Sequence, residues 1–323
     1  MASNSTAVIV NSTAHLSSSL SDSTVYPCYF IPRPTVLPGI SDHLMAAAAP
    51  IVAYWFISLI FHVIDMGNWK CLNKYKIHDT AEVQAKNTVT RGNVVGNVIF
   101  QQTAQMFLGM LCAPGEAGNH VLEMQNLAST ISRILHCLGN NTTAERLMDL
   151  MGEQLVHYAY WWGIPFSQFL LAVFVMDTWQ YFLHRAMHSN RFLYKYFHSM
   201  HHRLYVPYAY GAMYGNPIET LLLDSMGAVI SGAVVGLSVR QTALFFAFSS
   251  CKTVDDHSGY NLPWDPFQMF SRNTADYHDL HHQVSGMKFN FSQPFFIHWD
   301  TVLGTRITRK ELESLKAQAK KTA

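Results

Sequence analysis

The sequence predicts an all-α protein with several membrane-spanning helices and a histidine-rich helical cap on the cytosolic side. Charged residues make up 13% of its 323 residues, and hydrophobic residues make up 49%. Soluble proteins carry about 25% charged residues, so this composition indicates a membrane protein. The chain has 17 histidines, and nine of them lie between His184 and His282.

Charge and cysteine usage support no other class of protein. A net charge of +1 gives no argument for a nucleic-acid partner. The five cysteines are scattered without Cys-x-x-Cys spacing, so the sequence predicts neither a zinc ribbon nor a disulfide framework. The histidines therefore carry the functional signal.

The first half of the chain is expected to begin in the lumen. Residues 1–43 form a predicted disordered tail, which is rich in Ser, Thr and Asn up to residue 25. The run 44–64 is the first predicted span, because about 20 apolar residues cross a bilayer. A lysine-rich loop with few acids follows, and the positive-inside rule places it in the cytosol. A second, less apolar span is predicted at 93–113, with a polar stripe that faces other helices.

The polar stretch 114–154 is expected to be a lumenal insert, because it contains five acids and only two arginines. A third span, 155–176, completes the membrane part at 44–176. The apolar run 221–251 has the length of a hairpin, which would keep the histidines before and after it on one side of the membrane. The tail 306–323 ends in Lys320-Lys321-Thr-Ala, which matches the dilysine retrieval signal of the endoplasmic reticulum.

Three histidine groups stand out within residues 177–305, the predicted catalytic domain. Residues i, i+3 and i+4 share one face of a helix, so each group is expected to present its imidazoles in one direction. The groups are the pair His184 and His188, the box His198, His201 and His202, and the equally spaced box His278, His281 and His282.

The number of imidazoles predicts two metal ions, because eight nitrogens exceed what one ion with an open position can use. Imidazole binds iron, zinc and copper, and the sequence alone does not distinguish iron from zinc. Ligands at the cytosolic ends of membrane helices favour oxidation of a lipid chain, for which two irons and O2 suffice, over hydrolysis. Structural zinc and metal transport stay open as alternatives, although transport predicts ionisable ligands at mid-membrane.

Further residues near these groups are expected to contribute to the site. His257 is the predicted ninth ligand, since it lies close to the last box. Acids beside the histidines are expected to orient imidazoles by accepting their free N–H. These acids are Asp177, Asp255, Asp256 and Asp279.

Several stretches around the boxes resemble a known family. They include Val206-Pro-Tyr-Ala-Tyr-Gly, Thr253-Val-Asp-Asp-His257 and Asn290-Phe-Ser-Gln-Pro. Over residues 177–305 the chain is similar to the fatty acid hydroxylase/sterol desaturase superfamily, and within it to the sphinganine C4-hydroxylases. One departure is Asn216, where relatives commonly carry His before the Pro. Its amide is expected to support the site without binding metal.

The resemblance implies a di-iron monooxygenase of the endoplasmic reticulum that hydroxylates carbon 4 of sphinganine or a dihydroceramide. It implies two iron ions, O2 as co-substrate and electrons from NAD(P)H. The sequence has no His-Pro-Gly-Gly haem signature, so a separate cytochrome b5 and its reductase are the expected electron donors. Desaturation or oxidation of a sterol or an acyl chain by a related centre is the alternative.

Overall fold

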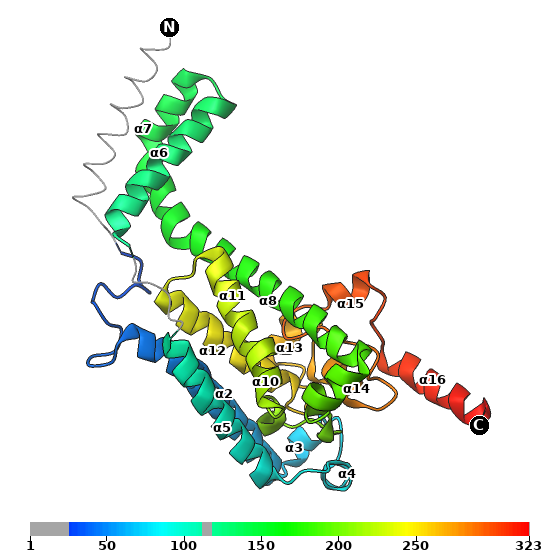
Figure 1. Ribbon diagram of the computed structural model, residues 1–323. Helices are drawn as coiled ribbons and strands as arrows, with labels where there is room; N and C mark the ends of the chain where they lie inside the picture. The colour runs from blue at the N-terminus through cyan, green and yellow to red at the C-terminus, as the bar shows by residue number, and fades with distance from the viewer. Residues whose placement is uncertain (1–25, 112–117, 323) are drawn as a thin grey trace. The chain divides into compact units, whose positions relative to one another are not determined.

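The structure is a computed structural model that describes residues 26–111 and 118–322 (Figure 1). Within these ranges all longer secondary structure is helical, and β pairing is limited to one bridge between Lys76 and Tyr260. This confirms the predicted all-α class. The α-helices are α2 (Asp42–Gly67), α3 (Lys70–Asn73), α4 (Thr80–Lys86), α5 (Arg91–Leu111), α6 (His120–Leu138), α7 (Asn141–Tyr158), α8 (Ile164–Ser189), α9 (Arg191–Leu193), α10 (Pro217–Thr220), α11 (Met226–Val235), α12 (Val239–Asp256), α13 (Pro266–Phe270), α14 (Ala275–His282), α15 (His298–Val302) and α16 (Arg309–Thr322). Short π-helical segments lie at Ala159–Gly163, Tyr194–His198 and Leu221–Ser225, and 3-10 turns lie at His201–Arg203 and Ala209–Gly211.

The chain divides into two compact units, and the first comprises residues 1–39 and 115–170. Here α6 and α7 pack against each other as a helical hairpin. Asn119 and Asn140 cap the two helices by accepting backbone N–H groups through their side chains. The insert predicted at 114–154 is therefore helical from His120. The buried core of this unit contains Met124, Ala128, Val156 and Trp161.

The described end of the predicted N-terminal tail packs against this first unit. The Phe30 ring centroid lies 4.8 Å from that of Trp161, and the Tyr29 hydroxyl donates to the Trp161 carbonyl. The tail predicted as disordered over 1–43 is therefore packed at these residues, and α2 begins already at Asp42. Residues 1–25 lie outside the described part of the chain.

The second unit, residues 40–114 and 171–323, contains all nine clustered histidines. Its scaffold is α2, which packs along α12 and α5 (Figure 1). Ala46 and Ala243 are buried where α2 meets α12, and such small side chains let two helices approach closely. At the same end Arg240 Nε lies 2.7 Å from Asp42 Oδ2, which fixes the register of the two helices.

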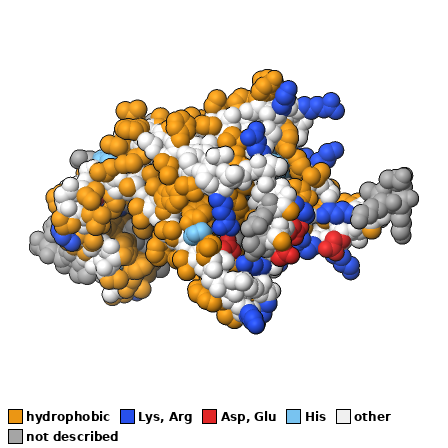
Figure 2. Space-filling model, turned by 90° about the horizontal axis from the view of Figure 1, so that it is seen from below, with side chains coloured by type: hydrophobic (Ala, Val, Ile, Leu, Met, Phe, Trp, Pro, Cys, Tyr) orange, Lys and Arg blue, Asp and Glu red, His pale blue; other side chains and the backbone are white. Residues whose placement is uncertain are grey.

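Within the described part of the chain, three helical stretches are long and apolar enough to cross a membrane: residues 42–67, 141–189 and 217–235. They confirm the prediction of a multi-span helical membrane protein. Apolar side chains such as Phe56, which is 63% exposed, lie on their surfaces, and Figure 2 shows many on the face it presents. Such exposure suits contact with lipid.

The first and third predicted spans, 44–64 and 155–176, lie within the first two of these helices. Residues 93–111 of the predicted span 93–113 lie in helix α5, which is not among the three, and residues 112 and 113 lie outside the described residues. Its polar stripe packs inward at Gln101, which is buried and donates through Nε2 to the Gly215 carbonyl at 2.9 Å, whereas Asn93 at the start of the stripe is exposed.

The predicted hairpin 221–251 forms as α11 and α12, which are joined by a tight turn. Gly236 has a φ of +69°, a left-handed conformation that glycine adopts without steric cost. Ser238 then caps α12. Because only the first arm lies within an apolar candidate span, insertion of the whole hairpin into the membrane stays a prediction.

The C-terminal helix α16 packs onto α14 through Leu312, which is buried with Leu280 and Ile307. Lys320 and Lys321 lie near the end of α16, but their side chains lie outside the described residues. The retrieval signal therefore stays a prediction.

Candidate metal centre

The nine predicted ligands come from four segments of the second unit. His184 and His188 lie one turn apart near the end of α8, and His278, His281 and His282 lie on α14. The middle box is not on an α-helix, since His198 ends a π-helical segment and His201 and His202 lie in the following 3-10 turn. His257 follows the last residue of α12 as its C-cap.

The structure sorts these nine side chains into two groups of nearby ring nitrogens. Within each group the ligand atoms lie within 4.8 Å of one another. The first group contains His184, His188, His198, His202 and His281, and the second group contains His201, His257, His278 and His282. Each HxxHH box is therefore divided between the groups. This differs from the expectation that each box faces one direction, because the i+3 histidine of each box turns to the other group.

Backbone carbonyls fix the protonation of most of these rings. His184 Nδ1 lies 2.9 Å from the Phe291 carbonyl, and His281 Nδ1 lies 2.7 Å from the Phe289 carbonyl. A carbonyl only accepts, so Nδ1 carries the proton and Nε2 offers a lone pair. Three rings of the second group do the same, with Nδ1 of His201, His257 and His282 against the carbonyls of Tyr214, Thr253 and Leu204.

The Nε2 atoms converge at distances that suit ligands of one cation. Nε2 of His198 lies 2.7 Å from that of His188 in the first group, and Nε2 of His278 lies 3.0 Å from that of His257 in the second. Nitrogens bound at right angles to one ion, each at about 2.1 Å, lie about 3.0 Å apart. His281 Nε2 is buried with no hydrogen-bond partner among the described residues. The two groups thus fit two transition-metal ions.

Burial keeps these imidazoles neutral, as metal ligands must be. Removal from water lowers the pKa of His201 and, to about 3, the pKa of His257. It holds the pKa of each of the three α14 histidines well below the usual range, and neighbouring histidines add to this effect. A neutral ring presents a lone pair in place of a proton, so both groups are prepared for a cation.

The five residues predicted to support the imidazoles bind other partners. None of them hydrogen-bonds a ring of either group within the described chain, because backbone carbonyls already take most of the Nδ1 protons. Asp177 accepts from the Phe295 and Phe296 amides, Asn216 caps α10 and donates to the Tyr196 carbonyl, Asp255 accepts from Gln268, Asp256 pairs with Lys252, and Asp279 contacts His78, Gln283 and Arg309.

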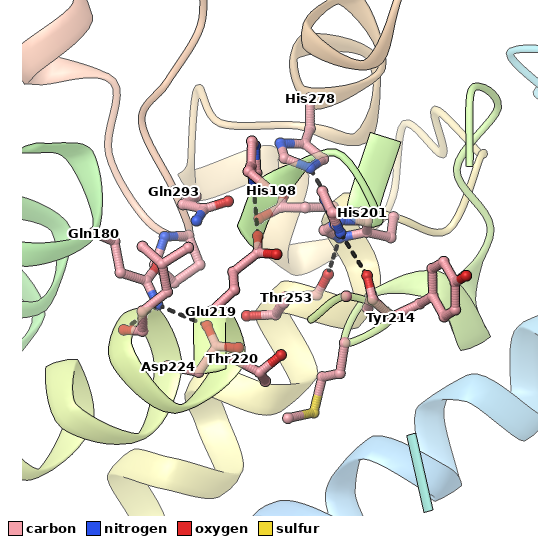
Figure 3. A pocket seen from close by; sticks show the side chains of 17 residues that line it. Gln180, His198, His201, Tyr214, Glu219, Thr220, Asp224, Thr253, His278 and Gln293 are labelled. Carbon is pink, nitrogen blue, oxygen red and sulfur yellow. Dashed lines mark hydrogen bonds and ion pairs between the residues drawn. The ribbon is translucent and has the colours of Figure 1, made fainter. Parts of the chain in front are cut away.

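The carboxylate that does contact a clustered imidazole is Glu219. Its Oε1 lies 2.5 Å from His198 Nδ1, and its side chain is buried (Figure 3). Sequence reasoning did not assign it a role. A signal was present, since Glu219 stands at the start of an apolar run, where an acid needs a buried partner.

Asp300 organises the loop whose carbonyls orient the first group. This carboxylate is fully buried and accepts from the amides of Phe291 and Ser292 at 3.1 and 2.8 Å. Its Oδ2 also accepts from the Tyr277 hydroxyl on α14 at 2.8 Å. The loop that bears the Phe291 carbonyl is therefore tied to the helix that bears three ligands, which explains why both stretches belong to one site.

Nine imidazoles in two groups, at the ends of helices in an apolar helical protein, define a membrane protein with a candidate two-metal centre. The chain belongs to the fatty acid hydroxylase family, whose sequence model matches residues 169–305. Membership supports hydroxylase activity, and hence an oxidoreductase, and it agrees with the presence of a metal centre.

Three relatives show how far the similarity extends. The chain is 42% identical over 278 residues to a sphingolipid C4-hydroxylase of Saccharomyces cerevisiae, covering 85% of this chain and 74% of the relative. It is 41% identical over 267 residues to sphinganine C4-monooxygenase 1 of Arabidopsis thaliana, covering 83% and 88%. A very-long-chain aldehyde decarbonylase of Oryza sativa is 39% identical over 268 residues, covering 83% and 90%. No solved structure matches the chain.

Proposed function

We propose that the protein is an O2-dependent sphinganine C4-monooxygenase that hydroxylates carbon 4 of sphinganine or a dihydroceramide. The observation that carries the proposal is the pair of converging imidazole groups in a chain that is about 40% identical to enzymes of that name over more than four fifths of its length. The reaction consumes the substrate C–H bond, O2, two electrons and two protons, and it yields the C–OH group and water.

The two histidine groups would each hold one iron ion. Bound iron would supply activation of O2, which zinc cannot supply because it has no redox chemistry. The chain's share is to fix the ligands through backbone carbonyls, to keep water away by burial and to position one carbon of the substrate. Because each HxxHH box serves both groups, the second and third boxes also fix the separation of the two groups.

The electrons would come from NAD(P)H through a separate cytochrome b5 and its reductase, because the sequence contains no haem signature of its own. The substrate would reach the centre from the lipid, since residues 164–189 of α8 and residues 217–235 belong to apolar candidate spans that border the site. We assign the protein to the endoplasmic-reticulum membrane, where its relatives' class of substrate would be embedded.

The reaction can be tested in microsomes that contain the protein, cytochrome b5, its reductase, NADH and a sphinganine-based lipid. We expect a product one oxygen heavier than the substrate, with label from 18-O2 in the new hydroxyl group. Microsomes that contain the His281→Ala variant serve as the control. A double bond as the main product would point to desaturation. No product from the sphinganine-based lipid, with loss of the carbonyl carbon from a long-chain aldehyde supplied in a parallel assay, would point to the decarbonylase activity of the Oryza relative. Either result would overturn the proposed function.

We also propose that the histidine centre and the C-terminus are cytosolic, from the lysine-rich loop that follows the first span. The exposed Asn140, in the helical hairpin of the first unit, is then lumenal and should receive a glycan. A sequon appended after Ala323 should stay unmodified. Endoglycosidase shift assays measure both sites, and the opposite pattern would contradict this topology.

A further inference from the structure

A small cavity borders both histidine groups. Its volume is about 30 Å³, and His198 of the first group and His201, His257 and His278 of the second group line it. Its other walls carry apolar side chains such as Leu223, and polar side chains from α8, from α10 and the π segment that follows it, from α12, and from the loop before α15 (Figure 3). The polar side chains are Gln180, Glu219, Thr220, Asp224, Thr253, Asp256 and Gln293.

One carboxylate on this wall has an oxygen without a hydrogen bond of good geometry. Glu219 is 5% exposed, and its Oε1 is taken by His198 Nδ1 at 2.5 Å. Its Oε2 is buried and makes no hydrogen bond of good geometry with the described residues, and the backbone N–H of Asn216 is the donor that interacts with this carboxylate. Leaving such an acceptor unsatisfied costs free energy, so a donor from a ligand is expected there.

The size and place of the cavity define that donor. A volume of about 30 Å³ holds a group the size of a water molecule or a hydroxyl, and it excludes an alkyl chain. Only the His198 ring separates Glu219 from the converging nitrogens of the first group. A hydroxyl bound at Oε2 would therefore lie beside the first histidine group.

We infer that Glu219 is a substrate-binding residue whose Oε2 accepts a hydrogen bond from the hydroxyl on carbon 3 of a sphingoid base. This inference rests on the proposed function, since carbon 3 is the neighbour of the oxidised carbon 4. With this role for Glu219, the cavity favours substrates that carry an O–H donor on the carbon next to the reacting one. Fatty aldehydes and simple acyl chains lack that donor.

The test exchanges hydrogen-bond donor and acceptor, first on the Glu219 side chain and then on the substrate. Glu219→Gln retains an oxygen for His198 Nδ1 and places an N–H donor where Oε2 accepted. Purified wild-type and variant proteins are compared on sphinganine and on its 3-keto analogue, in which the hydroxyl donor becomes an acceptor. We expect kcat/KM for sphinganine to fall about tenfold to a hundredfold in Glu219→Gln. For the keto analogue kcat/KM should stay level or rise.

Comparing the two substrates on one preparation cancels any loss of folded or metal-loaded protein. Iron content is measured alongside, and it should stay at the wild-type value. Asp65→Asn, a change of an acid that lines a different cavity, should leave the preference between the substrates unchanged. If Glu219→Gln does not fold, Glu219→Asp is used instead, because it withdraws the carboxylate by one methylene. This variant should also lower the ratio of kcat/KM for sphinganine to kcat/KM for the keto analogue.

Equal loss on both substrates, or iron loss in step with activity, would mean that Glu219 only positions His198, and would overturn the inference. An unchanged preference would overturn it as well. A wild-type protein that hydroxylates neither substrate would instead overturn the proposed function and this inference together.

Discussion

Replacing His281 by alanine is expected to abolish hydroxylation and to remove the ion of the first group. The ring lies centrally, with its centroid 4.5 Å from those of His184 and His188. Its Nδ1 donates to the Phe289 carbonyl, and its buried Nε2 has no hydrogen-bond partner among the described residues. The Nε2 lone pair is therefore available to an ion in the first group. Mutation of a residue that only supports a metal ligand costs about tenfold to a hundredfold in metal affinity or activity. Loss of the ligand itself should therefore cost at least about a hundredfold.

Activity and elemental analysis of the purified variant measure this prediction. His278→Ala is the matched change in the second group, and it should remove the other ion. His136→Ala is the control, because His136 belongs to the first unit and its Nδ1 donates to the Ser132 carbonyl of its own helix. His136→Ala should keep both ions and full activity. Wild-type iron content in His281→Ala would contradict the assignment of His281 as a ligand.

The ligand set could be predicted because its signal is local. Two HxxHH boxes and one HxxxH pair are spacings that bring imidazoles together on any helical segment. All nine predicted histidines lie in the two groups of the structure. The division of each box could not be predicted, because it depends on the turn after His198, where the α-helical spacing ends.

The support of the imidazoles could not be predicted because it comes mainly from backbone. The Phe289, Phe291 and Leu204 carbonyls carry no side-chain signature, and acids adjacent to histidines in sequence point elsewhere. Asp279 illustrates this, since it stands between two ligands yet binds His78 from 201 residues away. Only the fold shows which carbonyls face the rings.

Membrane spans could be predicted from the sequence where a run of residues is strongly apolar. The run predicted at 44–64 lies within α2 because it is apolar all round, and such runs identify spans well. Helix α5 mixes apolar residues with Asn97 and Gln101, which pack inside the protein. Hydropathy cannot distinguish such a helix from a weak span.

Removal of metal is expected to destabilise the protein as well as to inactivate it. Without an ion in the first group, the Nε2 atoms of His184 and His198 face each other at 3.0 Å while acceptors hold both Nδ1 atoms, so two lone pairs repel. An ion present at 100 times its dissociation constant stabilises the folded state by about 2.7 kcal/mol, and two ions by about twice that. Because each kcal/mol moves the melting temperature of a mid-sized protein by about 2–4 °C, chelation should lower it by on the order of 10 °C.

Thermal unfolding of detergent-solubilised protein measures this effect before and after treatment with a chelator, and after reloading. Iron should restore both the melting temperature and hydroxylation. Zinc also binds imidazole ligands but has no redox chemistry, so zinc should restore the melting temperature and leave the protein inactive. The two readouts separate the structural part of the site from its chemistry. A chelated protein that loses its ions without any change in melting temperature would show that the imidazole groups are not held together by metal, and full activity with zinc would exclude oxidation at this centre.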